Sequence, residues 1–211
     1  MPPGTICVTK TSPVVLFGPE MTEWTDESLA DLQQELVQRS DLRFLSVALM
    51  QLHKLQPSLS IDLKIPETSG LQQLGDFAAG EGGLHADGLT NTHFAALTIV
   101  KHVIDFKSYA LQTGATTYLP KLQAIQGFCI GFLSAAVVAS STNWVAFEHN
   151  TTCALRLAAC IGAVIDAEDR QHGFESSATA ISARWRTDSE RTFLEATLDA
   201  FPTVSSPISI R

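Results

Sequence analysis

The sequence predicts an α/β fold, and two features of the chain carry that prediction. Residues 14–17 form a short apolar run followed by Gly18-Pro19, the pattern of a buried parallel strand that ends in a turn. A second apolar run at residues 122–125 leads through two glycines into residues 132–139, whose composition favours a buried helix. Buried strands that alternate with helices are typical of α/β proteins.

Helical patterns fill most of the chain between and after these strands. Residues 25–27 begin a helix with two acidic side chains in its first turn, and leucines follow at helical spacing. A second helix is predicted at about residues 42–55, ending before Pro57, with a mixed region after it. Residues 90–112 and residues 144–168 predict two further long helices.

The last third of the chain changes character. Residues 178–185 alternate like a strand, residues 188–201 follow an amphipathic helical pattern, and residues 204–210 have the composition of a second strand. This β–α–β unit is half of a small ferredoxin-like subdomain. We therefore expect an α/β core over residues 1–175 and an incomplete small subdomain over residues 176–211.

Composition and charge exclude several classes of partner. The chain has 211 residues and a net charge of -8, so it offers no basic stripe for phosphates, and we expect no nucleic-acid partner. Residues 124–141 are apolar, but Gln126, three serines and two glycines interrupt them, so we expect no membrane span. The N-terminus lacks a signal-peptide pattern and the four cysteines lack disulfide spacing. These features predict a cytoplasmic protein with reduced thiols.

Other polar groups give weaker signals. Three histidines are too scattered to form a metal site, namely His85, His93 and His102, and no HExxH motif is present. We therefore expect neither a metal nor a bound cofactor. The charged helix end from Asp166 to Arg170 is expected to be a solvated face. Cys153 and Cys160, seven residues apart on one helix, are expected to pack in the core.

The stretch Gly127-Phe128-Cys129-Ile130-Gly131 carries the clearest chemical signal. It places a thiol between a strand and a helix, as the nucleophile elbow of hydrolases and acyl transferases does. The glycines allow a sharp turn and leave room for an acyl group, and the positive end of the helix dipole favours a thiolate. The Ile130 N–H would be half of an oxyanion hole. The alternative is an inert core cysteine.

Several segments taken together resemble one family. They are residues 15–18, the helix at residues 97–109, the elbow at residues 127–131 with its Ala-rich helix, residues 156–163 and residues 182–185. The chain resembles the starter-unit acyl-carrier-protein transacylase domain of fungal non-reducing polyketide synthases, and the similarity covers about residues 12–202.

This resemblance implies a fold and a reaction. The implied fold is an α/β-hydrolase-like core of the malonyl-transacylase type with a ferredoxin-like subdomain. The implied reaction moves a starter acyl group from coenzyme A or a partner synthase to the phosphopantetheine arm of an acyl carrier protein. Cys129 would carry the acyl group as a thioester, Ile130 would supply the oxyanion donor, and Gly127, Phe128 and Gly131 would contact the substrate. The implied partners are the acyl carrier protein and other polyketide synthase domains.

Three positions depart from the family pattern. The family's second catalytic residue is a histidine beyond the small subdomain, where this sequence has already ended, and His149 and His172 lie in other contexts. The first loop, which supplies a glutamine in the family, reads Gly18-Pro19-Glu20, and an ionised Glu20 would repel an oxyanion. Ile161 occupies the position of the arginine in malonyl transacylases, which predicts an uncharged acyl group.

These departures leave more than one function open. The first is an enzyme that transfers acyl groups by a ping-pong route through Cys129. The second is a truncated, catalytically incomplete relative, either a gene fragment or a binding partner of an acyl carrier protein or synthase. A thioesterase-like hydrolase that uses the same cysteine is a third, weaker option.

Overall fold

The computed structural model describes residues 13–18, 24–62, 65, 69–115, 119 and 121–171, together with five single positions: 187, 189, 192, 193 and 196. The chain divides into two units, Met1–Ser176 and Ser177–Arg211. The expected small subdomain falls almost entirely outside the described residues, so its fold stays a prediction.

Two short parallel strands form a sheet at one side of the first unit. Strand β1 (Val14–Phe17) pairs with β2 (Ala124–Gly127) in a register that sets Val14 opposite Ala124 and Phe17 opposite Gly127. The parallel strand predicted at residues 14–17 is confirmed, and β2 begins two residues later than the predicted apolar run. The described part of the chain is otherwise helical, and the larger sheet of an α/β-hydrolase-like core stays a prediction.

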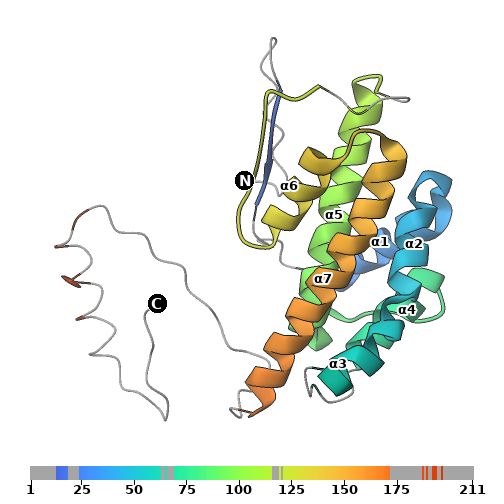
Figure 1. Cartoon of the computed structure of the whole chain (residues 1–211). Helices are drawn as coiled ribbons and strands as arrows, with labels where there is room; N and C mark the ends of the chain where they lie inside the picture. Colours follow the sequence, from blue (N-terminus) through green and yellow to red (C-terminus); the bar gives the residue numbers. More distant parts are fainter. Residues whose placement is uncertain are drawn as a thin grey trace. The chain divides into compact units, whose positions relative to one another are not determined.

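The other regular elements described in this unit are helices, and Figure 1 shows α5, α6 and α7 on one side of the two strands. Their bounds are α1 (Asp26–Gln38), η1 (Ser40–Leu42), α2 (Arg43–Met50), η2 (Leu52–Leu55), α3 (Gln56–Asp62), α4 (Ser69–Ala79), η3 (Ala86–Gly88), α5 (Asn91–Gln112), α6 (Gly131–Ser140) and α7 (Trp144–Gln171). Each helix in the described ranges is too short or too polar to cross a membrane.

The single helix predicted over residues 42–55 is wrong, because the chain changes from α2 to the 3-10 helix η2 there. The His53 ring nitrogen Nδ1 lies 2.7 Å from the Met50 carbonyl oxygen, the group that an α-helix would pair with the Lys54 N–H. The Lys54 N–H donates instead to Gln51, three residues back. Pro57 lies in the first turn of α3, a helix that was not predicted from the sequence.

Helix α5 forms the centre of the unit and packs along α7 (Figure 1). Aromatic side chains from both helices meet in the core, where the Phe106 and Phe147 ring centroids lie 5.5 Å apart. The two backbones also approach closely, since a Cβ atom on Gly162 of α7 would lie 2.4 Å from the Asn91 carbonyl oxygen. The strands and α6 are therefore held against a rigid pair of helices.

Candidate active site

Cys129 lies at a sharp turn between β2 and α6. Its φ is +56°, and no other described residue except glycine has a positive φ. A side chain in this left-handed region costs on the order of 1–3 kcal/mol and persists only where the surrounding structure enforces it. This backbone is the strained strand–turn–helix geometry that a nucleophile elbow requires.

Two glycines make this turn possible through close backbone contacts. A Cβ atom on Gly127 would lie 2.2 Å from the Gly131 carbonyl oxygen. A Cβ atom on Gly131 would lie 2.4 Å from the carbonyl oxygens of Phe17 and Gly18. Since real Cβ contacts are much longer, the end of β1 presses against the start of α6. The loop at Gly18, by contrast, has open space at its own Cβ position.

The first turn of α6 leaves one amide available beside the thiol. The N–H groups of Gly131, Phe132 and Leu133 each donate to a carbonyl three residues earlier, over 3.0 Å. The Ile130 N–H makes no hydrogen bond with any residue in the described ranges. It is an unsatisfied donor at a helix N-terminus, which is the arrangement that accepts an oxyanion.

The thiol is accessible and has apolar neighbours in the sequence. Cys129 is exposed. Phe128 and Phe132 are 50% and 65% exposed, and Leu16 on β1 is 46% exposed. Exposed aromatic side chains on both sides of an exposed thiol would offer a surface for an apolar acyl group.

His102 packs against the elements that hold the elbow, and it contacts Ser134 and Phe17 and not Cys129. Its Nδ1 lies 3.0 Å from Ser134 Oγ on α6, and its ring centroid lies 5.3 Å from that of Phe17 on β1. Burial, with a smaller contribution from Lys101, lowers the pKa of His102 to about 4. The ring is therefore neutral at pH 7 and joins α5, α6 and β1 beneath the turn.

The other histidines do not reach the elbow within the described residues. His149 Nε2 lies 3.9 Å from Cys153 Sγ, one turn away on α7. His93 is buried, and its Nδ1 accepts a hydrogen bond from the Thr90 N–H at the start of α5. His172 and Glu20 lie outside the described residues. In the described ranges, no cluster of three or more His, Cys, Asp or Glu side chains could hold a metal ion.

Ile161 lies on a face of α7 that is apolar and partly exposed. Its side chain is 39% exposed. Three residues at helical spacing share this face, namely Leu157 (50% exposed), Val164 (39%) and Ile165 (43%). Ile161 is itself apolar, so this position supplies no positive charge to a substrate carboxylate. Helix α7 packs against α6, which begins at the elbow.

Two sequence expectations about α7 are wrong. Cys153 is exposed, because the buried face of α7 points toward α5 and Cys153 lies on another face. Asp166 is half-buried, and its carboxylate accepts hydrogen bonds from the Asn91 N–H and from the N–H and hydroxyl of Thr92. A charged helix end thus caps the N-terminus of α5, a contact that spacing along α7 alone could not indicate.

Comparison with known proteins identifies the family. A family model described as "Starter unit:ACP transacylase in aflatoxin biosynthesis" matches residues 15–204. The non-reducing polyketide synthase adrD of Penicillium roqueforti is 30% identical over 193 residues, covering 90% of this chain. The polyketide synthase mapC of Penicillium roqueforti strain FM164 is 32% identical over 207 residues, again covering 90% of this chain.

A third relative, the non-reducing polyketide synthase nvfA of Aspergillus novofumigatus, is 27% identical over 192 residues, or 89% of this chain. The chain spans only 7–8% of the length of these three synthases. The family match nevertheless includes most of β1, all of β2, the elbow and the long described helices α5 and α7. The chain belongs to the starter unit:ACP transacylase family of fungal non-reducing polyketide synthases.

Proposed function

We propose that the chain is a starter-unit acyl transferase of polyketide biosynthesis that carries the acyl group as a thioester on Cys129. One observation carries this proposal. Cys129 has a φ of +56° between β2 and α6, next to an Ile130 amide that makes no hydrogen bond with a described residue. A strained backbone at an exposed thiol, beside an N–H donor that no described residue engages, suits an activated nucleophile.

The transfer takes two displacement steps. The Cys129 thiolate attacks the carbonyl carbon of the donor thioester, and the Ile130 N–H donates to the oxyanion that forms. The intermediate collapses to an acyl-Cys129 thioester and releases the donor thiol, which takes up a proton. The phosphopantetheine thiol of an acyl carrier protein then loses its proton, attacks the acyl-Cys129 carbonyl and leaves Cys129 as the thiolate.

The proposed substrate is an uncharged acyl group carried by coenzyme A or phosphopantetheine. Phe128 and the backbone of Gly127, Gly131 and Gly18 surround the turn and would contact the thioester. Ile161 lies on an apolar stretch of α7 and cannot itself pair with a carboxylate. The hydrocarbon part of an acyl group gains free energy by leaving water, so it suits such a surface.

A second function is a catalytically incomplete relative that binds an acyl carrier protein without transferring acyl groups. One observation favours it: no histidine in the described ranges contacts Cys129. Proton transfer to and from the thiols by a general acid–base is worth roughly two to four orders of magnitude in rate. A thioesterase-like hydrolase that uses the same cysteine is the third option.

Intact-mass spectrometry after incubation with a panel of acyl-coenzyme A thioesters separates these functions. We expect one acyl adduct, lost in Cys129→Ala and kept in Cys153→Ala, because Cys153 is also an exposed thiol but lacks the strained turn. A chase with an acyl carrier protein should move the adduct onto the carrier. Release as free acid would instead indicate a hydrolase, and a folded chain without any adduct would leave the incomplete relative.

A further inference from the structure

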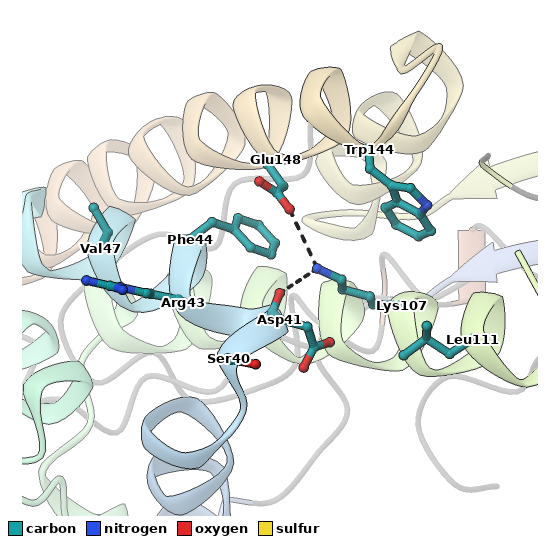
Figure 2. Close-up of a pocket in the computed structure, with 9 residues that line it drawn as sticks. All are labelled: Ser40, Asp41, Arg43, Phe44, Val47, Lys107, Leu111, Trp144 and Glu148. Atoms are coloured by element: carbon teal, nitrogen blue, oxygen red, sulfur yellow. Dashed lines mark hydrogen bonds and ion pairs between the residues drawn. The ribbon is translucent and has the colours of Figure 1, made fainter. Parts of the chain in front are cut away.

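A pocket of about 610 Å³ lies between the start of α2, the end of α5 and the start of α7 (Figure 2). Its volume falls within the range of small-molecule sites. Nine residues line it: Ser40, Asp41, Arg43, Phe44, Val47, Lys107, Leu111, Trp144 and Glu148. None of these nine residues belongs to the elbow or to α6.

Lys107 is the only buried cation among the nine residues that line this pocket, with a side chain that is 10% exposed. Its ammonium donates to the Asp41 carbonyl oxygen and lies over the rings of Phe44 and Trp144, 4.8 Å and 5.7 Å from their centroids. Figure 2 shows the ammonium between these two aromatic walls. A lysine has three N–H donors, so this one keeps capacity for a further acceptor.

Two acidic and two basic side chains line the pocket, so its formal charge is balanced, and the position of each charge decides what it can bind. The Asp41 carboxylate is paired with Arg39 over 2.9 Å, and the pKa of Asp41 is lowered, mainly by its hydrogen bond from Arg39. Glu148 pairs with Lys107 over 3.6 Å, beyond hydrogen-bond distance, and its side chain is 41% exposed. Arg43 is exposed at the rim and makes no ion pair with a described residue.

We propose that this pocket binds a small aromatic or aliphatic monocarboxylate. The apolar part would lie against Phe44, Trp144 and the rim residues Val47 and Leu111, which are 38% and 45% exposed. The carboxylate would accept a hydrogen bond from the Lys107 ammonium, which has a free donor and little water around it. Charge-assisted hydrogen bonds in such surroundings are among the strongest that proteins make.

The charges of Glu148 and Arg43 decide whether the pocket prefers an anionic, a neutral or a cationic ligand. Glu148 is a loosely held counter-ion that an incoming carboxylate would displace into solvent, because its side chain is already partly exposed. Arg43 adds a second positive charge among the residues that line the pocket. The pocket should therefore favour an anion over the matching alcohol, and an alcohol over the matching amine.

Calorimetric titration of the 211-residue chain with 2-naphthoate tests the proposal, with 2-naphthylmethanol and 2-naphthylmethylamine as uncharged and cationic probes. We expect saturable binding of 2-naphthoate, weakened about tenfold or more by Lys107→Met and severalfold by Arg43→Gln. Glu148→Gln should strengthen binding, because it removes the competing carboxylate. Cys129→Ala should leave binding unchanged, which separates this site from the acyl-transfer site.

Lys107 also bonds the Asp41 backbone, so circular dichroism of each variant is needed to show that it is folded before its binding is compared. Arg43 and Glu148 are exposed or partly exposed, so their variants keep the test informative if Lys107→Met fails to fold. The proposal is overturned if 2-naphthoate does not bind saturably. Equal binding of the alcohol, tighter binding of the amine, or weaker binding to Glu148→Gln would also overturn it.

Discussion

His102 Nδ1 and Ser134 Oγ lie 3.0 Å apart beneath the turn that presents Cys129. His102 comes from the middle of α5 and Ser134 from the first turns of α6, so this contact fixes the start of the nucleophile's helix to the central helix of the unit. Both side chains are buried, at 7% and 2% exposed. Burial of the ring disfavours its protonated form, which leads to a pH dependence.

Stability should fall as pH drops from about 6.5 to about 4. Burial lowers the pKa of His102 from 6.5 to about 4, and burial also lowers the pKa of His93. The unfolded chain therefore binds more protons than the folded one in this window, so stability is complete above pH 6.5 and is lost on acidification. Urea unfolding at pH 7 and pH 4.5 should differ by on the order of 2 kcal/mol. His102→Gln should flatten the profile, and an unchanged slope in that variant would contradict this role.

Asp166 should stabilise the start of α5 through its carboxylate. The Asn91 and Thr92 N–H groups donate to it over 2.8 Å and 3.1 Å, which satisfies two donors that a helix N-terminus leaves open. Burial raises the pKa of Asp166, but the hydrogen bonds from Thr92 and its neighbours outweigh this and leave the pKa lowered. Asp166→Ala should cost about 1–2 kcal/mol in urea unfolding at pH 7. Arg156→Ala, an exposed change on the same helix, should have little effect, and equal losses in the two variants would rule out the cap.

The elbow could be predicted from sequence because its determinants are local. An apolar run, two glycines four residues apart and a helix-forming segment specify strand, turn and helix together, and the structure has β2, Cys129 with positive φ and α6 in that order. The Asp166 cap could not be predicted, since its partners lie 74 and 75 residues away. The pocket around Lys107 joins three separate segments, and helical spacing does not determine how such helices cross.

Gly131→Ala should deform the elbow. A Cβ atom at this position would lie 2.4 Å from the Phe17 and Gly18 carbonyl oxygens, both of which are backbone and cannot rotate away. We expect a loss of roughly 2–3 kcal/mol in urea unfolding, together with the loss of acylation at Cys129. Gly83→Ala is the matched control, because nothing lies within 4 Å of its Cβ position. If Gly131→Ala is as stable as the control, the close approach of β1 and α6 is wrong.

Cys129→Gly should make the chain more stable than Cys129→Ala while removing the nucleophile. Glycine adopts a φ near +56° without the steric cost that any Cβ atom carries, so the difference should be about 1 kcal/mol in favour of glycine. At Cys153, in the interior of α7, the order should reverse, because glycine costs about 1 kcal/mol relative to alanine within a helix. Urea unfolding of the four variants measures both differences under the same conditions. The reversed order between the two sites would show that Cys129 is held in strain for its chemistry, whereas the same order at both would show that the turn costs nothing.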